Sequence, residues 1–211
     1  MGNTVGSLNQ VQKDIIIGTI LGDGYLRIVR GRKNAFLEVN HSFSEKDYVD
    51  WKYNHLKKFV KSMPKSRKGN GKRIAYRFYT RQMPDLTVLF KKFYDNKKKI
   101  IPSWLRLSPL ILAVWFMDDG HKSYRTYYLN SQQFSLESQK FLIKLLSDLG
   151  IKSTLNRDKK YFRIRIKQES AQRFKNLISK FVIPKMKYKL GNNPVETSLV
   201  RNQRDGKNNL P

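Results

Sequence analysis

The chain of 211 residues contains no cysteine, three scattered histidines and few acidic residues. Without cysteine there can be no disulfide framework, no thiolate-bound zinc and no cysteine nucleophile. The histidines, His41, His55 and His121, lack the close spacing of a helical metal site. There is also no run of about 18 apolar residues, and we expect no signal peptide. These absences argue against a secreted disulfide-rich protein, a zinc enzyme and a membrane-spanning protein.

What the chain has in excess is positive charge. Lysine and arginine number 43 against 16 aspartate and glutamate, which gives a formal net charge of +27. This charge is far more than solubility requires, and it favours a polyanion such as nucleic acid as the partner. A basic protein on a membrane surface is the alternative, but no amphipathic helix stands out. We therefore expect no membrane partner and an intracellular location, either in an organelle (mitochondrion or chloroplast) or in a bacterial cytoplasm.

Two similar apolar segments, each closed by an acid and a glycine, organise the chain. They are Ile15–Gly24 (IIIGTILGDG) and Leu110–Gly120 (LILAVWFMDDG). Each predicts a helix that is buried nearly all round. The closing glycines are expected to adopt the left-handed conformation, which places Asp23 and Asp119 in or just beyond the last turn. The helix dipole disfavours a carboxylate there by about 0.3 to 1 kcal/mol, so a bound cation would explain why the arrangement occurs twice.

These segments resemble the LAGLIDADG homing endonucleases, in particular the compact single-chain branch with two motifs. Ile16–Gly24 and Leu112–Gly120 both place Asp at the eighth position and Gly at the ninth position of the nine-residue motif. Two further segments match that branch, Lys97–Leu105 (KKKIIPSWL) and Val182–Leu190 (VIPKMKYKL). The resemblance covers about residues 11–190. It implies that the two helices pack together at the centre of the molecule and that their acids bind the metal ions that cut DNA.

The order of elements after the first motif is repeated, with shorter loops, after the second. Phe134–Gly150 corresponds to the helical segment Phe43–Phe59, and Tyr161–Gln168 corresponds to the strand-like Ala75–Gln82. We expect an α/β (α+β) fold of two pseudo-twofold-related αββαββα-like halves, with antiparallel sheets forming a DNA-binding saddle around two central helices. The expected divisions are a first half at 1–105, a second half at 106–190 and a polar tail at 191–211.

Asp23 and Asp119 are the candidate catalytic metal ligands. Asp-Gly is also ordinary turn chemistry, so either site alone could be structural. Two packed carboxylates stay ionised at low cost only with a cation between them, and hard oxygen ligands favour Mg²⁺, for which Mn²⁺ substitutes. The resemblance implies further ligands at the backbone carbonyls of Gly22 and Asp118. Asp118 departs from the small residue of the first motif, which leaves the role of its side chain open.

Lys99 and Lys189 lie in the two matching segments, where the resemblance implies catalytic lysines. Such lysines could lower the pKa of the attacking water or hold the scissile phosphate. The alternative is that they are two among 43 basic residues.

Alternating strands carry the expected DNA interface. If Ile74, Tyr76 and Phe78 face the core, the basic and polar residues between them face away. A solvated basic face is the alternative, but Arg, Tyr, Asn and Gln on one face suit the reading of base edges in a major groove. Segments 30–33 and 65–73 are expected to be loops that contact phosphate. The expected DNA-contacting residues are Arg27, Arg30, Arg32, Lys33, Glu38, Asn40, Arg73, Arg77, Tyr79, Arg81, Lys122, Arg125, Asn130, Gln132, Arg163, Arg165 and Lys167.

We therefore expect a monomeric, divalent-metal-dependent endonuclease that cuts both strands of DNA at a long asymmetric site, with water as the nucleophile. The resemblance implies that it promotes the mobility of an intron or an intervening element. One alternative is an intron maturase, which would bind intron RNA on the same scaffold. A second is a DNA-binding regulator that does not cut, but the presence of both acids argues against it.

Overall fold

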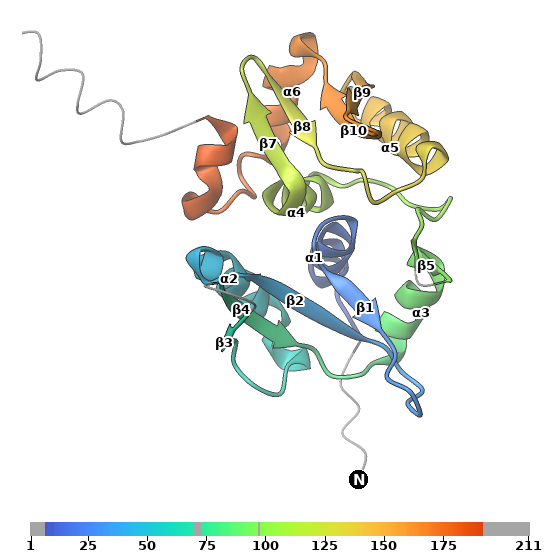
Figure 1. Ribbon diagram of the computed structural model, residues 1–211, viewed down its shortest axis with the longest axis vertical. Coiled ribbons are helices and arrows are strands. Elements are labelled where there is room, and N and C mark those ends of the chain that lie inside the picture. Colours follow the sequence, from blue (N-terminus) through green and yellow to red (C-terminus); the bar gives the residue numbers. More distant parts are fainter. Residues whose placement is uncertain (1–6, 70–72, 97, 192–211) are drawn as a thin grey trace, which may run out of the picture.

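The computed structural model describes residues 7–69, 73–96 and 98–191, which fold into two α/β units of the same element order (Figure 1). The expected αββαββα-like order is confirmed in both. The first unit consists of α1 (Gln10–Leu21), β1 (Tyr25–Arg27), β2 (Phe36–Ser42), α2 (Lys46–Leu56), β3 (Lys65–Lys68), β4 (Ile74–Tyr79) and α3 (Pro84–Phe93). The second consists of α4 (Pro109–Asp119), β7 (Gly120–Ser123), β8 (Thr126–Leu129), α5 (Leu136–Asp148), β9 (Ser153–Asp158), β10 (Tyr161–Ile166) and α6 (Gln168–Ile178).

Shorter elements connect and extend these units. A two-stranded ribbon of β5 (Tyr94–Asp95) and β6 (Lys98–Lys99) lies between α3 and α4, and the 3-10 helix η3 (Pro184–Leu190) follows α6. Two further 3-10 turns, η1 (Phe43–Glu45) and η2 (Lys57–Phe59), flank α2. No helix among the described residues is long and apolar enough to cross a membrane.

The two four-stranded sheets have the same topology. Their strand orders are β1-β2-β4-β3 and β7-β8-β10-β9, and every pairing is antiparallel. In the first sheet Val39 pairs with Phe78, and in the second Leu129 pairs with Ile164, so apolar residues line the inner face of each sheet. The other face of each sheet is therefore free to carry polar residues.

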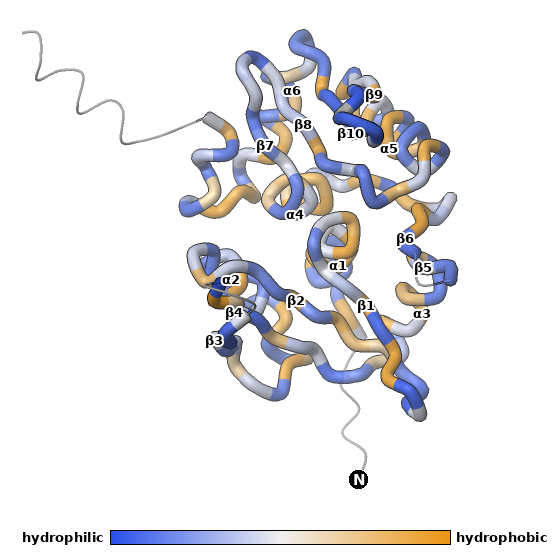
Figure 2. Tube along the Cα trace, viewed as in Figure 1, coloured by the Kyte–Doolittle hydropathy of each residue, from blue (hydrophilic) through white to orange (hydrophobic). Residues whose placement is uncertain are grey.

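The helices α1 and α4 pack against each other between the two units, and both are buried over most of their length (Figure 1). Gly18 permits the close approach, since a Cβ there would lie 2.6 Å from Val114 Cβ and 2.7 Å from the Ile111 carbonyl oxygen. In Figure 2 these central helices are among the more apolar parts of the chain, whereas the edge strand β3 is hydrophilic. The helix contact is thus the core that joins the halves.

The helix starts are defined by side-chain caps. Asn9 caps α1 in a reciprocal capping box with Gln12, and Ser108 caps α4 by accepting from the Ile111 amide. Asp14 is buried within α1, where its Oδ2 accepts a 2.6 Å hydrogen bond from the Ser108 hydroxyl. The N-terminal ends of the two central helices are therefore bonded to each other.

The prediction that the closing glycines, Gly24 and Gly120, adopt the left-handed conformation is wrong. Positive φ angles among glycines occur at other positions, and Gly120 has φ −93° because it already begins β7. What requires glycine is space: a Cβ on Gly24 would lie 2.3 Å from Thr19 Cγ2, and one on Gly120 would lie 2.0 Å from Phe116 Cδ2. The chain turns straight back over the helix that it has just left.

The basic segment predicted as a loop over 65–73 is partly a strand. Lys65–Lys68 forms the edge strand β3, paired with β4 from Lys65 opposite Arg77 to Lys68 opposite Ile74. Four exposed polar residues give no alternating signal, and only pairing with β4 orders them. Residues 70–72, Lys97 and nearly all of the expected tail at 191–211 lie outside the described residues. The division of the chain at 105 and 190 stays a prediction.

Candidate active site and nucleic-acid interface

Asp23 and Asp119 come together at the C-terminal ends of the two central helices. Asp119 is the last residue of α4, and Asp23 lies two residues beyond the end of α1. Burial, followed by the nearby charges of Asp23 and Asp118, raises the pKa of Asp119 to about 7. Partial burial and the charge of Asp118 also raise the pKa of Asp23. Each carboxylate is thus in a place where its own ionisation is disfavoured.

The two predicted lysines each donate hydrogen bonds to backbone carbonyl oxygens beside these acids. Lys99 donates to the carbonyl oxygen of Gly22 at 2.6 Å, and Lys189 donates to the carbonyl oxygens of Met117 and Asp118, the latter at 3.3 Å. Burial lowers the pKa of Lys99 to about 8 and lowers that of Lys189 in the same way. The structure therefore brings the acids, the lysines and the two implied carbonyls into one site, although the lysines come from unlike elements, β6 and η3.

The donor set fits a hard divalent cation. The site offers two carboxylates, each of which disfavours the ionisation of the other. It also offers two backbone carbonyl oxygens that accept hydrogen bonds from lysine ammonium groups. These are oxygen ligands of the kind that Mg²⁺ prefers. Within the part of the chain that the structure describes, no group of three or more His, Cys, Asp or Glu side chains converges on a metal position. Carbonyl, water and phosphate oxygens would have to complete the coordination.

Gln133 belongs to this site and was missed by the sequence reasoning, which chose its neighbour Gln132. The amide nitrogen of Gln133 donates to the Leu21 carbonyl at 3.0 Å and lies 3.4 Å from both the Gly22 carbonyl and Asp119 Oδ2. A signal was present in the repeat, because LNSQQFS is one residue longer than its counterpart VNHSFS. The extra residue falls in the turn that carries Gln133 to the Gly22 carbonyl and Asp119.

A buried charged cluster behind Asp23 was also missed. Lys52 on α2 and Asp118 on α4 are fully buried, and Lys52 Nζ donates to Asp118 Oδ1 at 2.7 Å. The ring of His41 lies between them and the surface, with Nε2 3.6 Å from Asp118 and Nδ1 3.7 Å from Asp23 and 3.5 Å from Glu45. The Asp118 side chain is therefore engaged by Lys52, while its backbone carbonyl faces Lys189.

The outer face of the first sheet carries many of the expected DNA-contacting residues. Arg27, Glu38, Asn40, Arg77 and Tyr79 share this face, as the pairings of Glu38 with Tyr79 and of Asn40 with Arg77 show. The predicted loop residues Arg30, Arg32 and Lys33 are exposed between β1 and β2, Arg73 is exposed just before β4, and Arg81 follows β4.

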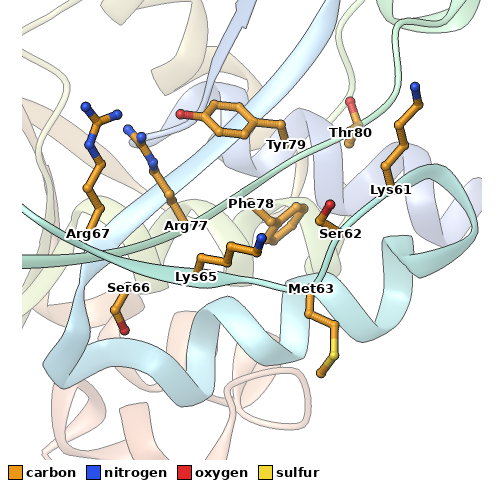
Figure 3. A pocket seen from close by; sticks show the side chains of 10 residues that line it. All are labelled: Lys61, Ser62, Met63, Lys65, Ser66, Arg67, Arg77, Phe78, Tyr79 and Thr80. Atoms are coloured by element: carbon orange, nitrogen blue, oxygen red, sulfur yellow. The ribbon is translucent and has the colours of Figure 1, made fainter.

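Beside β4 the same sheet is hollowed. A hollow of about 430 Å³ is lined by basic residues around the ring of Phe78, namely Lys61, Lys65, Arg67 and Arg77 (Figure 3). Arg67, Arg77 and the Tyr79 hydroxyl extend on the same side of the strands in this view. Lys61 and Thr80 also line an adjoining hollow of about 600 Å³ with Arg32 and Arg81. The two hollows form a continuous basic surface suited to phosphate.

The outer face of the second sheet carries a stack of three side chains. The ring of His121 stacks on Tyr128 at 5.3 Å, and the Arg163 guanidinium lies 4.3 Å from the centre of the Tyr128 ring. Arg165, which pairs with Tyr128, is exposed, as are Lys167 at the start of α6 and Arg125 at the β7–β8 turn. Asn130 and Gln132 follow β8 and are half-buried.

Lys122 lies elsewhere. It pairs with Tyr127, a core residue, and so points to the opposite side of β7 from His121, with its ammonium group beside Gly191. The physical reason is that β7 begins at Gly120, which fixes the alternation so that His121 rather than Lys122 joins the outer face. The structure brings the other expected residues onto or around the two faces; their contacts with DNA stay predictions.

Comparison with known proteins identifies the family. The LAGLIDADG DNA endonuclease family matches over residues 13–174. A probable intron-encoded endonuclease 1 from Wickerhamomyces canadensis is 32% identical, over 87% of this chain and 85% of the relative. The cytochrome b mRNA maturase bI2 of Saccharomyces cerevisiae is 31% identical over 91% of this chain, which spans 50% of that relative's length.

A solved structure agrees with these sequence matches. The homing endonuclease I-WcaI bound to its DNA recognition sequence superimposes with a TM-score of 0.81 and 30% identity, covering 88% of both chains. At this coverage the match extends over both α/β units. The chain belongs to the LAGLIDADG DNA endonuclease family.

Proposed function

We propose that the chain is a divalent-metal-dependent endonuclease that cuts both strands of a DNA duplex at a long asymmetric sequence. The observation that carries the proposal is the meeting of Asp23 and Asp119 at adjoining helix ends, between two sheets with basic outer faces. The family match and the likeness to a DNA-bound homing endonuclease support it. The promotion of intron or intervening-element mobility by a monomer is part of the same proposal.

The chain's own residues divide the work of phosphodiester hydrolysis. Asp23, Asp119 and the carbonyls of Gly22 and Asp118 would hold Mg²⁺, with Mn²⁺ as a substitute. Bound divalent ions supply an activated water and neutralise the charge that develops on the phosphate. Lys99, whose pKa is about 8, remains largely protonated near neutral pH and can donate to a phosphate oxygen or to the attacking water.

The experiment that tests this function uses Asp23→Asn and Asp119→Asn. A randomised duplex pool is cut by the wild-type chain with Mg²⁺, and the cut ends are sequenced to give the target. Both variants should lose cleavage but keep DNA affinity within a few fold, because most affinity comes from phosphate contacts while the lost carboxylate acts on the metal and the transition state.

The matched control is Asp148→Asn, which alters an exposed acid at the end of α5. It should cut as the wild-type chain does. Normal cutting by Asp23→Asn or Asp119→Asn, or wild-type cutting that does not respond to a chelator, would contradict the proposal.

A second function is favoured by one observation, the 31% identity to the yeast cytochrome b mRNA maturase over most of this chain. An intron maturase would bind intron RNA and promote its splicing in addition to, or instead of, cutting DNA. One relative is named as intron-encoded and the other as a maturase of cytochrome b mRNA. These names also favour an organelle, specifically a mitochondrion, as the place where this chain is encoded. A splicing assay with Asp23→Asn separates the activities, because loss of cleavage should leave splicing intact.

A further inference from the structure

Among the described residues, Glu38 is the one acid at the centre of the basic outer face of the first sheet. It lies on β2, between β1 and β4, and its side chain is 17% exposed. Its Oε2 is 3.1 Å from Arg27 Nη2, and its Oε1 is 3.9 Å from Arg77 Nη1. The Tyr79 hydroxyl donates to the same Oε1 at 3.4 Å. One carboxylate thus contacts all three of the principal side chains on this face.

Aromatic rings also contact the guanidinium groups of Arg27 and Arg77. Arg27 lies 5.0 Å from the centre of the Phe36 ring, and Arg77 lies 5.3 Å from that of Tyr79. The Phe36 and Tyr79 rings themselves meet edge to face at 5.8 Å. Since a guanidinium has five N–H donors, contact with one carboxylate oxygen leaves most of its donors available for a base edge.

A carboxylate in this place has two opposing effects on DNA binding. Its negative charge repels the phosphate backbone and lowers affinity for every sequence. It also restrains two long side chains that would otherwise swing to whichever phosphate is near, and pre-organised groups discriminate better than mobile ones. A salt bridge that only stabilised the sheet would leave base choice unchanged.

We propose that Glu38 is a specificity-determining positioning residue, which orients Arg27 and Arg77 toward base edges in the half-site under the first sheet and lowers affinity for other sequences. The inference rests on the proposed function, because it assumes that this face reads duplex DNA. It makes Glu38 unlike the basic residues around it, whose loss should weaken binding.

The test compares Glu38→Gln and Glu38→Asp with the wild-type full chain. The probes are the duplex recovered by cleavage of the randomised pool, every single substitution of it, and an unrelated duplex of the same length. Binding is measured without cleavage, in the Asp119→Asn background, at one fixed salt concentration. Arg27→Ala and Arg77→Ala identify which base pairs depend on the two arginines.

Glu38→Gln should bind the unrelated duplex several-fold more tightly, because one negative charge is lost. It should discriminate about tenfold less at the base pairs that depend on Arg27 or Arg77, the size expected when a good bidentate contact is loosened. Glu38→Asp keeps the charge but shortens the side chain, so it should lose the discrimination without the gain in non-specific affinity.

The control for charge alone is Glu169→Gln, which removes an acid paired with Lys152 at 3.2 Å on the surface of the second unit. It should leave discrimination unchanged in both half-sites. Unchanged discrimination in Glu38→Gln, equal loss in both half-sites, or loss only at a base pair that neither arginine affects would each overturn the proposal. A wild-type chain with no sequence preference would instead overturn the proposed function, so the two failures are distinguishable.

Discussion

Lys52 and Asp118 form a fully buried ion pair 2.7 Å long that crosses from the first unit to the second. The Tyr48 hydroxyl makes a second crossing, donating to the Val114 carbonyl at 3.1 Å. In the other unit Ile143 stands at the position of Lys52, and Gln139, at the position of Tyr48, is buried and bonded to Ser131 without charge. The junction of the halves is therefore symmetric in backbone and asymmetric in charge.

Breaking this ion pair from one side should be costly. Lys52→Met leaves the Asp118 carboxylate buried without its partner, which should lower the free energy of unfolding by about 3 to 5 kcal/mol. The double substitution Lys52→Met with Asp118→Ala removes both charges and should recover most of that loss. Chemical denaturation of the wild type, both single variants and the double variant measures the coupling, and purely additive losses would contradict it.

Stability without metal should fall and then rise with pH. The pKa of Asp119 is raised from 3.8 to about 7, so the folded state binds the extra proton, and stability should decrease as pH rises from about 4 to 7. The pKa of Lys99 is lowered from 10.5 to about 8, so the unfolded state binds the extra proton, and stability should increase between about 8 and 10.5.

Thermal denaturation in a chelator checks this profile. Asp119→Asn should reduce the decrease on the acid side, whereas Asp148→Asn, at an exposed position, should not. Added Mg²⁺ competes with the proton on Asp119, so its stabilising effect should weaken below about pH 7. If the stability of Asp119→Asn decreased between about pH 4 and 7 as much as that of the wild type, the raised pKa of Asp119 would be contradicted.

Tyr124 at the β7–β8 turn should be destabilising as it stands. It has φ 52° and is 84% exposed, so strain is present without compensating burial. Asparagine tolerates this conformation, so Tyr124→Asn should raise the free energy of unfolding by about 1 kcal/mol. The reciprocal change is Gly31→Ala, at φ 78° with no atom within 4 Å of the added Cβ, which should lower it by a similar amount. Thermal melts that move in the same direction would contradict the argument.

The two sheets should read different half-sites. Arg77→Ala should relax base choice only under the first unit, and Arg165→Ala only under the second, because the two residues lie on separate sheets. A bidentate contact contributes about 1 to 3 kcal/mol of discrimination, so tolerance should rise about tenfold or more at one or two base pairs. Cleavage of a library carrying every single substitution of the target measures both. Uniform weakening at all positions would mean that these arginines contact only phosphate.

The architecture was accessible from the sequence because its main determinants are local. The two apolar runs, their closing Asp-Gly and the repeated order of patterns predict two buried helices and two equivalent α/β units, and the structure has both. The alternation of Tyr76 and Phe78 with Arg77 and Tyr79 likewise predicts which face of β4 is outward. These features depend on residues only a few positions apart.

The remaining features depend on contacts between distant segments. Lys52 stands in a helix with other lysines nearby, and nothing local distinguishes it until Asp118, 66 positions away, is placed beside it. The side of β7 on which Lys122 lies is set by where the strand begins, and the pairing of 65–68 is set by β4. Such choices belong to packing rather than to propensity.

The charged junction also bears on how such a chain could be built or rebuilt. A molecule assembled from two copies of the first unit would bury two Lys52 ammonium groups with no carboxylate opposite, because Gly22 stands where Asp118 should be. Two copies of the second unit would bring Asp118 against Asp118, where even a single Cβ on Gly22 would lie 2.3 Å away. The two units therefore complement each other in charge, and a chimera that pairs this first unit with a foreign second unit would need an acid at the position equivalent to Asp118.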